Sequence, residues 1–171
     1  MPATMLDRTT GTLTIEDNSF SLGDRNDPQS PLYHVGSLPD PRVTGLLATA
    51  PGFVAVTCGV HLGGITVTTE IWDGPPEPDL DSWEDVAEVS VTWPTSPIAA
   101  CGTDVDIPIA LPPAPGGTYR VRDSVRHRDA GEDRGPDDPQ EQHLIQIWPD
   151  TPCQDELLKA TDSTGALWRA H

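Results

Sequence analysis

Lysine is almost absent from this chain. Lys159 is the one lysine among ten basic residues, which face 27 aspartates and glutamates and leave a formal net charge of −17. Such a charge repels a phosphate backbone and an anionic lipid surface, so we expect no direct binding of nucleic acid or membrane. The partner that this charge favours is a basic protein, although a high net charge also serves solubility alone.

Long apolar runs and targeting signals are also missing. No stretch approaches the roughly 20 apolar residues that cross a bilayer, and the first residues lack the charged-then-apolar pattern of a secretory signal. Cys58, Cys101 and Cys153 show no C-x-x-C spacing, so the usual zinc and redox patterns are absent. These absences predict a soluble cytoplasmic protein with reduced thiols. One disulfide, with one cysteine left over, stays open.

The common catalytic motifs are missing as well. The five histidines form no H-x-x-x-H or H-E-x-x-H pair, there is no G-x-S-x-G elbow, and no glycine-rich loop precedes a helix. We therefore predict no catalytic residue, no metal site and no cofactor. Cys58 lies close to His61, but a thiol at this inward-facing position is expected to be buried and inert. An enzyme whose residues converge in three dimensions alone stays open.

What the chain does contain is a series of short alternating runs separated by 15 glycines and 19 prolines. The clearest is GITVTTEIW, residues 64–72, in which Ile65, Val67 and Ile71 alternate with threonine and glutamate. Alternation of this kind predicts a strand with one face buried and one face in water. Similar runs occur near residues 11–22, 53–60, 88–93, 105–111, 118–125 and 143–148.

These runs predict an all-β fold. About eight short strands with turn residues between them are typical of an antiparallel β-sandwich, jelly-roll-like, and the length fits one domain over residues 1–171. One short helix is predicted near the C-terminus at DELLKAT, residues 155–161, with Asp155 near its start.

Three segments lack the alternation and are predicted to be loops: a long one at residues 23–42 and acidic ones at 73–85 and 129–141. The loop at 73–85 resembles a cation trap, and Asp79 and Asp81 could begin an EF-hand. Trp83 then occupies the next ligand position and the turn glycine is missing, so the calcium pattern fails. We predict instead a proline-stiffened crossover between two strands.

Two groups of side chains are candidates for binding. The first is a partner surface on the acidic loop at residues 73–85 and the tryptophan before it, where carboxylates and tryptophans could contact a basic protein: Trp72, Asp79, Asp81, Trp83, Glu84 and Asp85. The second is a stripe of arginines that would share one face of a regular strand: Arg120, Arg122, Arg126 and Arg128. Guanidinium groups bind anions, but they could equally pair with carboxylates of neighbouring strands on a solvated face.

Several stretches resemble known sequences: GVHLGGITVTTEIWDGPPE (59–77), SWEDVAEVSVTW (82–93) and TYRVRDSV (118–125) followed by HLIQIWP (143–149). They are similar to a group of actinobacterial proteins and, more distantly, to the competence protein J family. That family has a leucine-proline, glycine, tyrosine turn before a strand, and Leu111, Pro112, Gly117 and Tyr119 hold those places here.

The resemblance covers the layout of residues 10–150, and the segments 23–42 and 129–141 depart from it. Members of the competence protein J family inhibit a DNA-entry nuclease. The resemblance therefore implies a small acidic β protein that binds and restrains another protein, and it transfers no individual functional residue.

The leading functional hypothesis is thus a non-enzymatic acidic binding protein, an inhibitor or immunity-type protein acting on a basic partner such as a nuclease. One alternative is a small-ligand binder or jelly-roll enzyme in which Arg120, Arg122 and Trp148 line a cleft. Another is a structural component of a larger assembly. The oligomeric state is left open.

Overall fold

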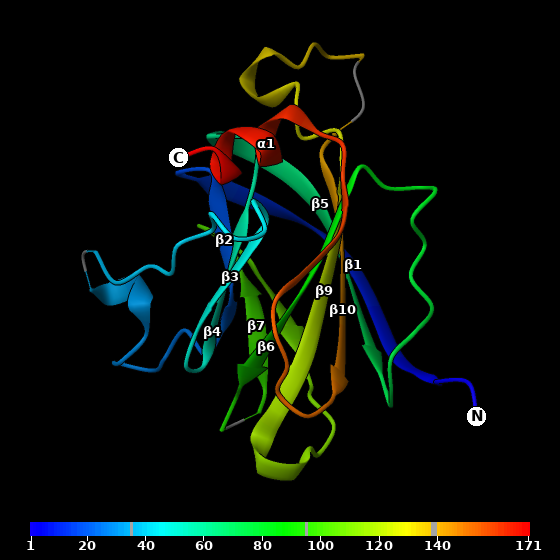
Figure 1. Cartoon of the computed structure of the whole chain (residues 1–171). Coiled ribbons are helices and arrows are strands. Elements are labelled where there is room, and N and C mark those ends of the chain that lie inside the picture. The colour runs from blue at the N-terminus through cyan, green and yellow to red at the C-terminus, as the bar shows by residue number, and fades with distance from the viewer. Residues whose placement is uncertain (35, 95, 138–139) are drawn as a thin grey trace.

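The computed structural model describes residues 1–34, 36–94, 96–137 and 140–171 (Figure 1). These residues form eleven strands and one short α-helix, in the order β1 (Met5–Glu16), β2 (Ser19–Gly23), β3 (Leu47–Ala50), β4 (Phe53–Thr57), β5 (Leu62–Trp72), β6 (Asp85–Thr92), β7 (Ile98–Cys101), β8 (Asp106–Ile109), β9 (Thr118–Arg126), β10 (Gln142–Pro149), β11 (Glu156–Ala160) and α1 (Ser163–Arg169). Short 3-10 turns lie at Pro31–Tyr33, Pro115–Gly117 and Gly131–Asp133.

The strands of the described residues belong to one mixed sheet. Its order is β11-β6-β9-β10-β5-β1-β2-β4-β3, with β7 and β8 branching from β2. The prediction of a β-rich fold with a short C-terminal helix is confirmed, but the antiparallel jelly-roll sandwich of about eight strands is wrong. β10 runs parallel to β5, and a parallel pair needs a long crossover connection, which residues 73–141 supply.

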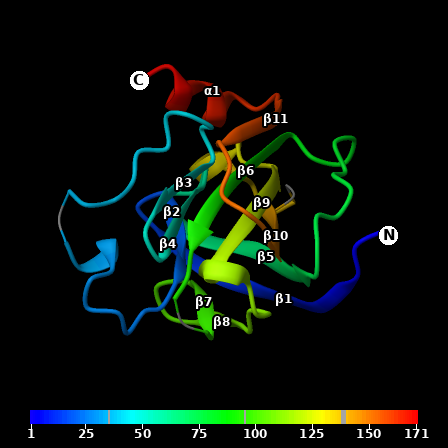
Figure 2. The same cartoon turned by 60° about the horizontal axis from the view of Figure 1, so that its bottom comes forward.

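The sheet folds over at the hairpin between β1 and β2. Asp17 and Asn18 both have positive φ, 59° and 60°, as a two-residue turn of this twist requires. Beyond that turn, apolar residues of β2 and β4 join those of β6, β9 and β10 in one buried cluster. In Figure 2, β2, β3 and β4 lie on one side of the molecule and β5, β9 and β10 on the other.

β9 departs from the predicted pattern of one dry face and one wet face. Eight of its nine residues are buried, because other parts of the chain cover the outer face of the sheet. Arg122 of β9 donates a hydrogen bond to the carbonyl of Pro76, and Arg120 donates to the carbonyl of Gln154. These bonds hold the segment before β6 and the segment before β11 against the outer face of the sheet.

The C-terminal helix lies later in the chain than predicted. Residues of the DELLKAT stretch form β11, which pairs with β6 and becomes the edge of the sheet. A short isolated helix is marginal, whereas the strand edge that β6 would otherwise leave open offers ready hydrogen bonds. α1 begins after Asp162, whose side chain accepts a hydrogen bond from the Gly165 amide at 2.7 Å. No helix among the described residues is long and apolar enough to cross a membrane.

Candidate functional site

Residues 73–84, here called the acidic crossover, connect β5 to β6 and project at the side of the molecule (Figure 1). Basic side chains hold its backbone rather than its carboxylates. Arg122 donates to the Pro76 carbonyl at 2.9 Å, Arg126 donates to the Ser82 carbonyl at 3.2 Å, and Lys159 donates to the Leu80 carbonyl. The segment is therefore fixed in place while its acidic groups stay available.

The carboxylates of the acidic crossover face water. Glu77, Asp79 and Asp81 are exposed, and within the described part of the chain no basic side chain forms an ion pair with them. The hydroxyl and amide of Ser82 donate to Asp79 and hold the pKa of its carboxyl below the usual range. Asp79 is thus ionised at neutral pH, the nearby charge of Lys159 also favours its ionised form, and the crossover presents exposed carboxylates.

Tryptophans stand at the two ends of the acidic crossover. Trp72 ends β5, is half-buried, and donates its indole N–H to Glu70 at 3.0 Å. The Trp83 ring lies 4.7 Å from the guanidinium of Arg126, a cation–π contact. Glu84 is half-buried and accepts a hydrogen bond from the His127 amide. Five of the six residues predicted to bind a partner are thus exposed or half-buried.

Asp85 is the exception. It is the first residue of β6, its exposed fraction is 0%, and one carboxylate oxygen accepts from the amides of Thr161 and Asp162 at 2.7 and 2.9 Å. Its other oxygen lies 3.3 Å from Arg128. Asp85 therefore anchors the C-terminal segment inside the protein and does not contribute to a partner surface.

The arginine stripe is also different from the expectation. Arg120 and Arg122 share one face of β9 and both pair with Glu88, at 3.3 and 2.8 Å, but this face is covered rather than solvated. Arg128 leaves the stripe because His127 has a φ of 65°, which turns the chain after β9 ends. The guanidinium groups of Arg120, Arg122 and Arg128 donate to protein oxygens, so the stripe does not form an anion-binding site.

No cleft opens where Arg120, Arg122 and Trp148 were expected to line one, as far as the described residues show. Trp148 has an exposed fraction of 1%, and the Arg122 guanidinium stacks 5.0 Å from its ring. The hollows lie elsewhere. One of about 510 Å³ lies between the 23–42 segment and β2, β4 and β7, and one of about 660 Å³ lies beside Trp72.

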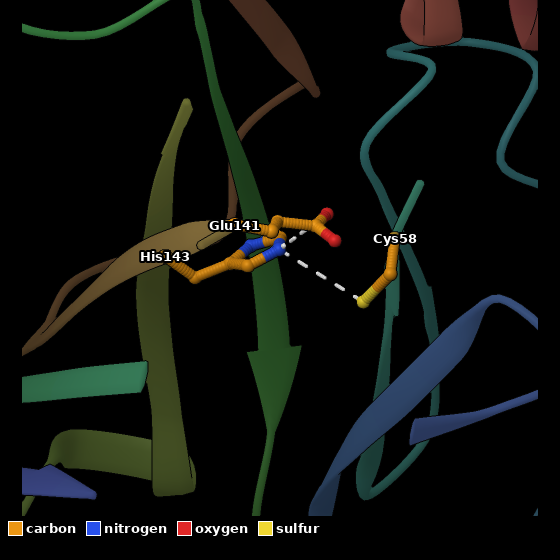
Figure 3. A group of neighbouring side chains, drawn as sticks. All are labelled: Cys58, Glu141 and His143. Carbon is orange, nitrogen blue, oxygen red and sulfur yellow. Dashed lines mark hydrogen bonds and ion pairs between the residues drawn. The ribbon is translucent and has the colours of Figure 1, made fainter. Parts of the chain in front are cut away.

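A buried cluster of ionisable groups lies inside the sheet (Figure 3). Cys58 follows β4, Glu141 directly precedes β10, and His143 belongs to β10. The histidine Nε2 lies 3.2 Å from Glu141 Oε1 and 3.8 Å from Cys58 Sγ. Its Nδ1 lies 2.7 Å from Oδ2 of Asp123, a buried residue of β9.

Electrostatics make this cluster unsuited to nucleophilic catalysis. Desolvation alone would lower the pKa of His143, but the carboxylates of Asp123 and Glu141 outweigh it and hold that pKa well above its ordinary value. Burial raises the pKa of the Cys58 thiol to about 11. A thiol in this state is a weak nucleophile, and its exposed fraction of 1% keeps substrates away.

The alternating pattern alone did not reveal the cluster. Cys58 was expected at an inward-facing position, and both Cys58 and His143 are buried. Cys58 follows β4 and His143 lies on β10, two strands that are not neighbours in the sheet, and the two residues are 85 positions apart. The spacing of Glu141 and His143, two residues apart, was the one local signal that could have indicated a shared direction.

The cysteines differ in accessibility, and this predicts their reactivity. All three are free, with Cys58 and Cys101 buried and Cys153 exposed. We expect Ellman's reagent to modify one thiol quickly in the native protein and three in urea, because a buried thiol must wait for local opening. The Cys153→Ser variant should show no fast thiol. Fast reaction of two or three native thiols would contradict this burial pattern.

The fold defines this chain as a small acidic protein built on one folded mixed sheet. No family model matches the sequence, and no curated protein sequence does. Among solved structures, the chain is similar to ComJ from Bacillus subtilis, an inhibitor of the DNA-degrading activity of NucA. The TM-score is 0.61 and the identity 10%, over 88% of this chain and 100% of ComJ.

A second similar structure is the crocagin biosynthetic gene J product. Its TM-score is 0.50 and its identity 19%, over 85% of this chain and 100% of that one. At such identities the likeness is one of fold. It confirms, as a distant structural resemblance, the likeness to the competence protein J family noted in the sequence.

Proposed function

We propose that this protein is a non-enzymatic inhibitor that binds a basic protein partner, such as a nuclease, through the acidic crossover. The observation that supports it best is the exposed carboxylates of Glu77, Asp79 and Asp81 on a segment whose backbone three basic side chains hold in place. A surface that is already ordered loses little conformational entropy on binding. Its charge would attract a basic partner and speed the encounter.

The distribution of basic residues supports the same proposal. Arg120, Arg122 and Arg128 are buried in internal ion pairs, so three of the ten basic residues are unavailable at the surface. Trp72 and Trp83 at the ends of the crossover supply the aromatic contacts that often dominate binding energy at interfaces. The fold likeness to ComJ, described as a nuclease inhibitor, adds support at the level of architecture.

The test is a DNA-degradation assay with a panel of basic nucleases, beginning with NucA. We expect the full chain to inhibit at least one of them at low salt, with inhibition weakening as salt rises because surface charges are screened. The double substitution Asp79→Asn, Asp81→Asn should slow association by about tenfold.

The matched control carries the same charge change elsewhere on the surface. Asp7 and Asp104 are also exposed, and Asp7→Asn combined with Asp104→Asn should inhibit like the unmodified protein. If no nuclease of the panel is inhibited at low salt, the proposed function is wrong. If inhibition occurs but both double variants behave alike, the acidic crossover is not the contact surface.

A further inference from the structure

Two of the separations between donor atoms in the buried cluster match those of ligands around a metal ion. Cys58 Sγ, one Glu141 oxygen and one His143 nitrogen all lie within 4.8 Å of one another. Around a tetrahedral zinc ion, bonds of ~2.3 Å to sulfur and ~2.0–2.1 Å to nitrogen and oxygen put nitrogen about 3.6 Å from sulfur and about 3.3 Å from oxygen. The separations here are 3.8 and 3.2 Å.

A second observation comes from the far side of the histidine ring. His143 Nδ1 lies 2.7 Å from Asp123 Oδ2, both side chains are fully buried, and the other Asp123 oxygen has no hydrogen-bond partner among the described atoms. Metal-binding histidines commonly donate their second N–H to a carboxylate in this way, which orients the ring. The carboxylate thus serves the histidine alone and leaves Nε2 directed at Glu141 and Cys58 (Figure 3).

The carboxylate of Glu141 is fixed in the same manner. Its Oε1 accepts from the Gly59 amide at 2.9 Å and its Oε2 from the Val60 amide at 3.4 Å. Ligating carboxylates are usually held by such outer hydrogen bonds. Gly59 and Val60 directly follow Cys58, so one short turn holds the Cys58 thiol and the Glu141 carboxylate close together.

We propose that Cys58, Glu141 and His143 form a binding site for a zinc-type divalent transition metal, with Asp123 as the positioning residue for His143. One thiolate, one imidazole and one carboxylate suit a borderline ion of this type rather than calcium or magnesium. Three protein donors leave the fourth position of a tetrahedron for a solvent ligand. This inference is independent of the proposed inhibitor function.

Metal binding at this site displaces protons and needs a route. The Cys58 thiol and His143 Nε2 each give up a proton to solvent as the divalent ion arrives, while His143 keeps the Nδ1 proton that it donates to Asp123. Two positive charges leave and two arrive, so the net charge of the buried cluster is unchanged. Gly59, next to Cys58, is half-buried and His61 is exposed. The route that the proposal requires is a local opening of this turn.

The test uses the full chain, freed of metal with a chelator and titrated with Co²⁺. We expect one equivalent to produce a thiolate-to-cobalt charge-transfer band in the near ultraviolet. The Cys58→Ser variant should lose the band and Cys101→Ser should keep it; both cysteines are buried and free, but Cys101 lies on β7, outside the cluster. Zn²⁺ at a hundredfold excess over its Kd should raise the Tm of the unmodified protein by roughly 5–10 °C.

The proposal is overturned if folded protein gives no charge-transfer band, if Cys58→Ser retains the band, or if Cys101→Ser loses it. Should Cys58→Ser fail to fold, X-ray absorption on the unmodified zinc-loaded protein decides the question. One sulfur at about 2.3 Å with nitrogen or oxygen at about 2.0–2.1 Å supports the site. A shell of nitrogen and oxygen without sulfur overturns it.

Discussion

Replacing Arg128 with methionine should lower the free energy of unfolding by about 3–5 kcal/mol, the usual cost of breaking a buried ion pair by removing one partner. The Arg128 side chain is fully buried, and its guanidinium donates to both oxygens of Asp162 at 2.8 Å and lies 3.3 Å from Asp85. It also donates to the carbonyls of Gly45 and Thr57. The variant therefore leaves Asp162 buried without its cation, and Asp85 keeps Arg169 alone, at 3.4 Å.

The loss in Arg128→Met should depend on pH. Desolvation already raises the pKa of Asp85 in the intact protein, and removal of Arg128 takes away an opposing positive charge. A carboxyl whose pKa is higher in the folded state than in the unfolded state costs stability above that pKa and regains it as the pH falls. We therefore expect Arg128→Met to lose less free energy of unfolding at about pH 4 than at neutral pH.

Urea unfolding with an unchanged m-value measures this effect, and Arg42→Met is its control. Arg42 pairs with Asp40 at the surface, where both side chains are largely exposed, so its replacement should leave the free energy of unfolding nearly unchanged. If Arg128→Met unfolds within 1 kcal/mol of the unmodified protein, the buried network does not hold the C-terminal segment as described.

The strands themselves could be read from the sequence because their alternation is local. The run at residues 64–72 became most of β5, and the run near residues 88–93 became most of β6. Alternation reports which residues share a face, but it does not report which strands become neighbours. The parallel placement of β10 beside β5 therefore had no local signal.

The candidate site was predictable to a similar degree. The acidic crossover was correctly located between two strands, since prolines and carboxylates mark such connections. Asp85 was wrongly assigned to the crossover surface. The residues that bury it, Arg128 and residues 161–162, are distant in sequence, so no local pattern indicates its burial. In the same way, the arginines of β9 were expected in water because the segments that cover them come from elsewhere in the chain.

The second large effect is expected at Glu88, the carboxylate shared by two buried arginines. Its oxygens lie 3.3 Å from Arg120 Nε and 2.8 Å from Arg122 Nε. Glu88→Gln keeps the size of the side chain but removes its charge, so two buried guanidinium groups lose their common counter-ion. We expect a loss of about 2–4 kcal/mol in the free energy of unfolding, measured in urea.

The acidic crossover should respond to the same change. Arg122 binds both Glu88 and the carbonyl of Pro76, so a guanidinium without its counter-ion is a weaker tether for that segment. Amide hydrogen exchange in residues 73–84 should therefore speed up in Glu88→Gln by more than the global loss of stability explains. Exchange that follows global stability alone would show that Arg122 does not hold the crossover.

The control for Glu88 is Glu156, which pairs with the same arginine. Glu156 lies 3.9 Å from Arg120 Nη2 and its side chain is 54% exposed, whereas that of Glu88 is 12% exposed. Glu156→Gln makes the same charge change, and we expect less than about 0.5 kcal/mol because water already solvates that carboxylate. The loss in Glu88→Gln should also persist in 1 M salt, since buried pairs are poorly screened. Equal effects of the two substitutions would mean that burial does not determine the strength of these pairs.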